Sequence, residues 1–475
     1  MHFPFEAPFT QHTLAPFTNI GRMRGIESST RCEIGPGQDR ARRPIEPSTQ
    51  HRPHNDTLAT PLSPPPRRRG AMPKTSRKLS LASADALLRS NVAPLHPKLL
   101  TAKLSKASTL PELLSLHETY GDHFNGLHIS AFWSKFKKLP RGTLDGLHDR
   151  LKPVCAQTLR MLPALEARAV ANVAHAFAKA RLTVGTGPWH DVWAALPKAV
   201  LRLLGGFTEQ SLSNTAWAFA KAGHSSPALF SAISAEALRR GLGGFNVQNL
   251  SNTAWAFASE GHAAPDLFDA ISAEALRRGL GCFKEQDLSN LAWAFAVFDH
   301  PSADELFTPA SFSSRLASLE RPFSVEALRQ LHQWSLWREE RGFRWPGLPG
   351  SLPQACRNAF VETEGRPSQL QRDVVRQIRS RGANVREEHR CKVSGYSIDA
   401  LVTLHDGERV AVEVDGPFHF VGRSQQPTGA TRLKHRQLRY FGWRLERIAY
   451  WEWDGDKNAA LRKLHWLPKS SSGPP

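Results

Sequence analysis

Cysteine is scarce in this sequence, and the few cysteines show no pattern. There are five, an odd number, and no two stand in C-x-x-C spacing: Cys32, Cys155, Cys282, Cys356 and Cys391. Disulfide frameworks and structural zinc sites need paired or clustered cysteines. We therefore expect neither, and a reducing compartment is the default.

Long apolar runs are also missing. Hydrophobic residues make up 40% of the 475 residues, enough for globular cores but without surplus. No window approaches the 18 uninterrupted apolar residues that indicate a spanning helix, so we expect no membrane insertion. A chain this long is typical of two or three domains with flexible segments.

Acidic residues are in deficit. Lysine and arginine number 62 against 43 aspartates and glutamates, a formal net charge of +19. Such a charge attracts polyanions, and nucleic acid is a more frequent partner than a membrane surface. The alternative is a basic tail that contributes nothing specific.

Residues 1–80 lack periodicity and are rich in proline, arginine, serine, threonine and histidine. This composition predicts a disordered basic segment, with an organellar transit peptide as one interpretation. Six acidic residues in it count against a transit peptide that begins at Met1. A start at Met72 would remove the conflict, because a basic, serine-rich stretch follows it.

Residues 82–340 have helical periodicity and contain an internal repeat. Related units occupy 205–242, 243–280 and 281–307, with a period of 38 residues. Each reads as a helix, a short turn, a second helix and a glycine-rich break. Because a single helical hairpin cannot bury its own apolar face, the repeat predicts an α-solenoid of stacked hairpins.

The first helix of each repeat carries two neighbouring stripes. The apolar stripe, Leu212 with Ala216, Phe219 and Ala220, is predicted core. The second contains Asn214, Trp217 and Lys221, and repeats as Asn252 with Trp255 and as Asn290 with Trp293. This second stripe suits bases and phosphates of single-stranded RNA. It also suits contacts within the solenoid, which we favour for the tryptophans, and both interpretations stay open for the asparagines.

An arginine pair ends the second helix of two repeats, Arg239 with Arg240 and Arg277 with Arg278. Arginines at this position complement the helix dipole. They also form a repeated basic ridge that suits a phosphate backbone.

After a predicted linker at 341–353, the pattern changes to a small α/β domain at 354–468, followed by a disordered tail at 469–475. Its predicted order is α-β-β-β-α-β-α. The last predicted strand is "WRLERIAYW", and the helix before it, "GATRLKHRQLRYFG", is strongly basic.

"IDALVTL", "VAVEVDGPFHF", "TGATRLKHRQL" and "FGWRLERIAYWEWD" follow in that order within 396–455. This series resembles the RAP domain, an RNA-binding module of organelle proteins. The upstream "LSNTAWAFA" units are similar to the octotricopeptide and heptatricopeptide repeats that precede RAP domains in FAST-kinase-like and related proteins. The resemblance implies a mitochondrial or chloroplast factor that binds transcripts and acts in their processing, stability or translation.

RAP domains resemble in turn the PD-(D/E)xK nuclease fold, in its very-short-patch-repair-like branch. The resemblance maps Asp399 and Glu413 onto residues that hold Mg²⁺ for RNA cleavage. The usual lysine is replaced by Asp415, which in a nuclease would supply another Mg²⁺ ligand, with His419 or His435 as the proton carrier. A reinforcing glutamate is absent from the preceding helix. The structural alternative, which we favour, is that Asp415 caps a turn and Glu413 pairs with the basic helix.

We therefore predict an RNA-binding protein without a cofactor, in which the solenoid recognises single-stranded RNA and the RAP-like domain contacts it, as part of a ribonucleoprotein assembly. Two alternatives remain, a Mg²⁺-dependent endoribonuclease and a protein-binding scaffold. In the RAP-like domain the predicted RNA contacts are Arg432, Lys434, Arg436, Arg439 and Trp453, and Trp451 is expected in the core.

Overall fold

The computed structural model describes residues 95–140, 147–183, 185, 187–320, 322–343, 347–362 and 366–467. Residues 93–475 belong to one compact unit. The predictions for 1–80, for a start at Met72 and for 469–475 lie outside the described residues.

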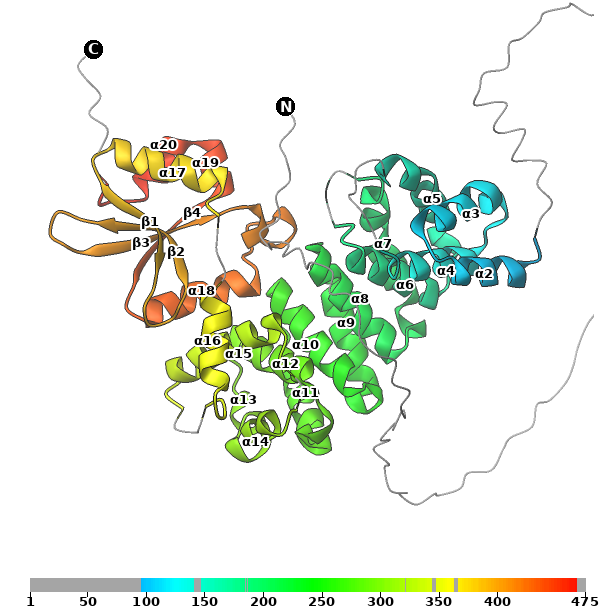
Figure 1. Cartoon of the computed structure of the whole chain (residues 1–475), viewed down its shortest axis with the longest axis horizontal. Helices are drawn as coiled ribbons and strands as arrows, with labels where there is room; N and C mark the ends of the chain where they lie inside the picture. Colours follow the sequence, from blue (N-terminus) through cyan, green and yellow to red (C-terminus); the bar gives the residue numbers. More distant parts are fainter. Residues whose placement is uncertain are drawn as a thin grey trace, which may run out of the picture. The chain divides into compact units, whose positions relative to one another are not determined.

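Helical hairpins form the larger part of the described chain (Figure 1). Their first helices pack on one another in chain order and are called the first layer. It consists of α2 (Pro97–Lys106), α4 (Gly126–Phe136), α6 (Ala167–Lys179), α8 (Glu209–Ala222), α10 (Val247–Glu260), α12 (Glu285–Phe298) and α15 (Val325–Glu340).

The intervening helices pack in the same order as a second layer. It consists of α3 (Leu110–Tyr120), α5 (Leu147–Met161), α7 (His190–Leu203), α9 (Pro227–Arg240), α11 (Pro265–Arg278) and the short α13 (Ala303–Leu306). The short α14 (Ser314–Ala317) follows, and α16 (Leu352–Val361) packs against α15. Part of the predicted linker at 341–353 is therefore helical.

The repeat determines where these helices begin and end. The first helices α8, α10 and α12 each have 14 residues. Each ends at a residue with left-handed backbone, Gly223 (φ 65°), Gly261 (φ 59°) or Asp299 (φ 53°). This conformation stops a helix and turns the chain into the next one. Proline then opens the second helix in two repeats, at Pro227 and Pro265, where it has no N–H bond to lose.

The predicted apolar stripe forms the core. Leu212, Ala216 and Phe219 are fully buried, and Ala220 is half-buried. Their counterparts in the next repeats are buried in the same continuous cluster. Stacking of neighbouring hairpins thus supplies the apolar contacts that one hairpin lacks.

The C-terminal domain contains the sheet. In chain order its elements are α17 (Gln369–Ser380), β1 (Asn384–Arg390), β2 (Ser397–Thr403), β3 (Arg409–Asp415), α18 (Gly429–Tyr440), β4 (Arg444–Ala449), α19 (Tyr450–Gly455) and α20 (Lys457–Arg462). The strand order is β1-β2-β3-β4. β1, β2 and β3 pair antiparallel, and β4 pairs parallel to β3 after the crossover through α18.

Both faces of the sheet are covered. Residues of α17, α19 and α20 pack on one face, around Val412, Ile448 and Trp453. On the other face, Ile398 and Ala411 pack with Leu438 of α18 and with Leu336 of the solenoid helix α15. The first layer and the sheet therefore share an apolar cluster.

The described residues are mostly helical with one small sheet, in agreement with the predicted order of a helical solenoid followed by a small α/β domain. One element differs, because the predicted strand at 443–451 ends at Ala449 and Tyr450 begins α19. No helix among the described residues has the length and apolar character of a membrane span. The four described cysteines are free thiols.

Candidate functional site

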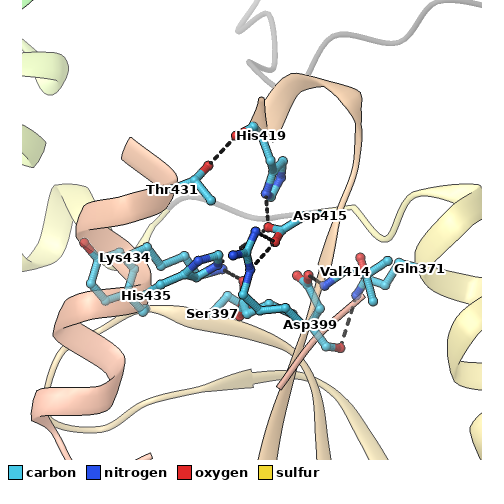
Figure 2. Close-up of polar contacts among 12 residues, drawn as sticks. Gln371, Ser397, Asp399, Val414, Asp415, His419, Thr431, Lys434 and His435 are labelled. Carbon is cyan, nitrogen blue, oxygen red and sulfur yellow. Dashed lines mark hydrogen bonds and ion pairs between the residues drawn. The ribbon is translucent and has the colours of Figure 1, made fainter. Parts of the chain in front are cut away.

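The acidic residues that the sequence singled out lie together beside α18 (Figure 2). Asp399 comes from β2, and Glu413 and Asp415 come from adjacent β3. Because alternate residues of a strand point to the same side, Glu413 and Asp415 both face α18. Both side chains are fully buried. Buried carboxylates need partners, and these partners decide what the cluster can do.

Glu413 pairs with a lysine. The Nζ atom of Lys434, on α18, lies 2.5 Å from Glu413 Oε2. Burial raises the pKa of Glu413 to about 8, with a further contribution from Asp399, while Lys434 acts in the opposite direction. Burial lowers the pKa of Lys434, but Glu413 and Asp399 outweigh this effect and raise it. The ammonium group therefore stays charged and neutralises the acidic cluster.

Asp415 has three basic neighbours. Its Oδ1 lies 2.7 Å from Nδ1 of His419 and 3.6 Å from Nε2 of His435. Its Oδ2 accepts a hydrogen bond from Nε of Arg447, on β4, at 2.8 Å. Burial alone would raise the pKa of Asp415, but the contacts with His419 and His435 hold it well below its usual value. Asp415 thus remains a carboxylate that ties the 416–428 loop, α18 and β4 together.

Asp399 completes the β2–β3 contact. Its Oδ2 accepts a hydrogen bond at 2.8 Å from the backbone N–H of Val414, beyond the last paired residues of the two strands. The side-chain amide of Gln371, on α17, donates to the Asp399 carbonyl and to Glu388. Gln371 therefore occupies the place on α17 where the nuclease resemblance expects a reinforcing glutamate. The sequence did not single out Gln371, because that resemblance concerns acidic residues. It did not single out Arg447 either, because this residue reaches Asp415 from a different strand, β4.

These partners decide whether the site suits Mg²⁺, which prefers carboxylate and water oxygens in octahedral geometry. Each of the three acids already accepts a hydrogen bond or an ion pair from the protein, and Lys434 lies directly on Glu413. Within the described ranges no three acidic, histidine or cysteine side chains form a group that could hold a metal ion. The residues present do not fit Mg²⁺, and we derive no cleavage step.

The basic helix α18 faces the solenoid with one side. Arg436 donates to the carbonyl oxygens of Ala296 (2.5 Å) and Val297 (2.9 Å) at the end of α12. Its Nε also pairs with Glu340, at the end of α15, at 2.7 Å. Among the described residues the Val297 carbonyl has no other donor, and the Ala296 carbonyl also accepts from the backbone N–H of Asp299 at 3.4 Å, so Arg436 adds to the left-handed turn that ends α12. Its predicted contact with RNA would compete with these bonds.

The loop before α18 makes equivalent contacts. Gln426 donates to the carbonyls of Glu260 and Gly261, at the end of α10. A side chain at Gly429 would overlap the carbonyl oxygen of Ala258, so glycine permits the close approach of α18 to α10. Arg432 is half-buried beside Gly261. Of the predicted basic residues on α18, Arg439 alone is exposed, and no ion pair holds it among the described residues.

The tryptophans at the end of the domain are arranged differently from the prediction. Trp453 was predicted to contact RNA, but it is only 3% exposed and packs in the core below the sheet. Trp451 was expected in the core and is half-buried, with its ring 4.2 Å from that of Phe420. Helix α19 begins at Tyr450, so strand alternation no longer decides which ring points inward. In this conformation the ring of Trp453 is inaccessible to a base.

In the solenoid, the predicted asparagines form a row along the first layer. Asn290 is buried and accepts hydrogen bonds from Gln286 and Gln330, and it donates to Asn252. By contrast, Asn214 is half-buried and makes no hydrogen bond among the described residues. The side chains of Asn252 and Asn290 are therefore hydrogen-bonded within the protein, whereas that of Asn214 has no such bond among the described residues.

The tryptophans form a parallel row. The rings of Trp217 and Trp255, and those of Trp255 and Trp293, have centroids 6.4 Å apart and planes inclined by 34°. Trp293 is 5% exposed and donates to Gln333 on α15, whereas Trp217 and Trp255 are half-buried. They pack between repeats as expected. Lys221 is exposed at the end of α8.

The two arginines of each pair differ. Arg240 and Arg278 are mostly buried and donate to the carbonyls of Gly205 and Gly243 respectively, in the glycine-rich break that opens the same repeat. Arg239 and Arg277 are exposed and pair with the glutamate three residues before each. The second arginine thus joins the two ends of its own repeat, and the predicted phosphate ridge reduces to the first.

The chain's C-terminal part has a recognised family. Residues 412–465 match the RAP domain, so the protein consists of stacked helical hairpins joined to a RAP domain. A curated relative is the chloroplastic RAP domain-containing protein of Oryza sativa subsp. japonica, 33% identical over 87 residues. The aligned part is 18% of this chain and only 13% of that relative. RAP domains are generally nucleic-acid-binding modules.

Proposed function

We propose that the chain is an RNA-binding protein of the mitochondrion or the chloroplast, in which the solenoid recognises single-stranded RNA and the RAP domain contacts it. It would act in the processing, stability or translation of a transcript, within a ribonucleoprotein assembly. The RAP match and the net charge of +19 support binding of nucleic acid. The chloroplastic relative supports an organellar location.

The observation that carries the proposal is an open group of side chains on α8, in the middle of the first layer. Asn214 has no hydrogen-bond partner among the described residues, the ring of Trp217 is half-buried, and Lys221 is exposed. An amide, an aromatic ring and a cation on one helix face are the groups that single-stranded RNA engages through base edges, stacking and phosphate.

The salt dependence of binding tests this function. Full-length protein is titrated with fluorescein-labelled oligouridine between about 50 and 200 mM salt, and log K is plotted against log salt. A steep negative slope is expected, with weaker binding to a duplex of the same length. A flat slope would contradict the polyanion argument and favour a protein partner for the solenoid.

The nuclease alternative has less support, because each acid already has a partner within the protein. Its test is cleavage of structured and unstructured RNA in Mg²⁺ by the wild type, beside an Asp399→Ala/Glu413→Ala variant. We expect no cleavage by either protein. Cleavage by the wild type that disappears in the variant would restore the enzyme hypothesis, with Lys434 supplying the lysine that Asp415 replaces.

A further inference from the structure

Lysines form a row at the ends of three successive first-layer helices, and two of them are absent from the predictions above. Lys137 follows α4, Lys179 ends α6 and Lys221 lies in the last turn of α8, at intervals of 42 residues. Because α4, α6 and α8 pack side by side, these positions are neighbours. Lys138 and Arg181 are exposed beside the row.

The lysine row ends at α8, before the first-layer helices that α18 contacts. In α10 and α12 the equivalent positions, 38 residues apart, are Ser259 and Val297. Val297 accepts a hydrogen bond from Arg436 through its carbonyl and lies against Gly429. Helix α18 therefore contacts α10 and α12, which lack the lysine, and also α15. The ends of α4, α6 and α8, which carry the lysines, lie outside these contacts.

The cations of the row act on one another. Burial lowers the pKa of Lys137, and Lys138 and Lys179 lower it further. The pKa of Lys221 is lowered as well, because its exposed side chain still places the ammonium group among neighbours that reduce its hydration, with Arg181 and Lys179 adding to the effect and Glu326 opposing it. No carboxylate pairs within 4 Å with Lys137, Lys138, Arg181 or Lys221 among the described residues.

Such a cluster destabilises the protein when it is alone, because like charges repel and partly buried charges lose hydration. An anion with several charges offsets the repulsion and compensates for the lost hydration by direct attraction. The aromatic side chains beside the lysines indicate which kind of anion fits. Trp217 lies beside the row, with Nζ of Lys179 5.3 Å from its ring centroid and the ring of His175 edge-on at 5.5 Å.

We propose that the Lys137–Lys179–Lys221 row and Trp217 form a binding strip for consecutive phosphates and one base of a single-stranded RNA. The inference rests on the proposed function and locates its main electrostatic contact at the α4–α8 end of the first layer, away from the RAP helix. Each lysine neutralises a phosphate, and Trp217 stacks on a base. Because a duplex hides its base faces, the strip selects a single strand.

The test compares two triple variants of the full-length protein in the oligouridine titration. The strip variant is Lys137→Gln/Lys179→Gln/Lys221→Gln. The control removes the same charge from three exposed lysines elsewhere, Lys152, Lys198 and Lys463. Loss of three phosphate contacts should reduce the magnitude of the strip variant's salt slope by about 2, since each contact with a single strand contributes about 0.7. The control should keep the wild-type slope.

The outcomes separate the two proposals. A steep wild-type slope with equal slopes for both triple variants overturns the strip and leaves the proposed function standing. A flat wild-type slope overturns both. If the strip variant loses its thermal unfolding transition, the single variant Lys221→Gln is compared with the wild type instead. The strip predicts a salt slope that is smaller in magnitude by about 0.7, and an unchanged slope overturns it.

Stacking has its own test. Trp217→Ala should weaken oligouridine binding by about tenfold at an unchanged salt slope, and Trp217→Phe should retain most of the affinity. Equal affinities of the two variants would remove Trp217 from the strip.

Discussion

Arg436 offers the sharpest test of how the RAP domain is attached to the solenoid. Its guanidinium makes two hydrogen bonds to carbonyls at the end of α12 and an ion pair with Glu340. The side chain of Arg436 is 29% exposed and that of Glu340 14%, so water can replace these contacts only in part. Among the described residues, Arg436→Ala leaves the Val297 carbonyl and the Glu340 carboxylate without a donor, and the Ala296 carbonyl keeps only its bond from Asp299.

Charge-assisted hydrogen bonds contribute about 1.5–3 kcal/mol each, and breaking a buried pair costs about 3–5 kcal/mol. Allowing for the exposure and for shared geometry, we expect Arg436→Ala to lower the free energy of unfolding by about 2–4 kcal/mol. Urea denaturation measures this loss, and hydrogen exchange locates it, because amides of α18 should lose protection. Arg436→Lys should recover part of the loss, since an ammonium retains the charge without the planar fork.

Arg439→Ala is the matched control, on the same helix but exposed and without an ion pair to any residue that the structure describes. It should change the free energy of unfolding by less than about 0.5 kcal/mol. Equal stabilities of the two alanine variants, with unchanged exchange in α18, would refute the capping role. If Arg436→Ala instead weakened RNA binding alone, the RNA contact predicted from the sequence would be correct.

Three further variants test other parts of the structure. Burial raises the pKa of Glu260 to about 8, so the folded protein holds a proton that the unfolded chain releases above its usual pKa of 4.5, and stability falls as pH rises between the two values. Glu260→Gln should be more stable than the wild type at pH 9, by up to roughly 4 kcal/mol, and equal near pH 4 in thermal melts; a constant difference would contradict the titration. Arg278→Ala should cost about 2–3 kcal/mol in urea and Arg277→Ala less than about 1 kcal/mol, because Arg278 donates to the Gly243 carbonyl at the start of its repeat whereas Arg277 is exposed; similar losses would show that the bond to Gly243 contributes little. Tyr396→Phe should cost about 1–2 kcal/mol, since the buried hydroxyl joins two glutamines, and an unchanged melting temperature would exclude that link.

The stacked hairpins could be predicted because their information is local and repeated. A period of 38 residues predicts helices of equal length in successive repeats, and the stripe of Leu212, Ala216 and Phe219 identifies the buried face. The four strands and the basic helix followed from alternation and turn residues. The error at Tyr450 arose because "IAYWEWD" suits a strand as well as a short helix, and packing against the sheet selected the helix from Tyr450 onward.

The partners of the charged residues could not be predicted in the same way. The sequence predicted that Glu413 pairs with the basic helix, and Lys434 of α18 is its partner, but the sequence did not show which cation would pair or that Arg436 points at the solenoid. Those directions depend on how α18 crosses the sheet and on which helix ends approach it. Gln371 illustrates a second limit. Its role depends on its bonds to Glu388 and to the Asp399 carbonyl, and a glutamine in the sequence does not reveal which acceptors it will have.

A chain of hydrogen bonds connects the tryptophan row with the RAP domain and gives α18 the position of an end cap. Trp293 donates to Gln333, Gln333 donates to the hydroxyl of Tyr396, and that hydroxyl donates to Gln437 on α18, whose amide returns to the Gln333 carbonyl. A solenoid needs its last repeats covered, because their stacking faces would otherwise meet water. Here one helix of the RAP domain covers the ends of three first-layer helices, and two of its cations, Arg432 and Arg436, lie in that contact. Among the described residues, the proposed strip on α4, α6 and α8 lies outside the contacts of α18 with the solenoid and stays open to a polyanion.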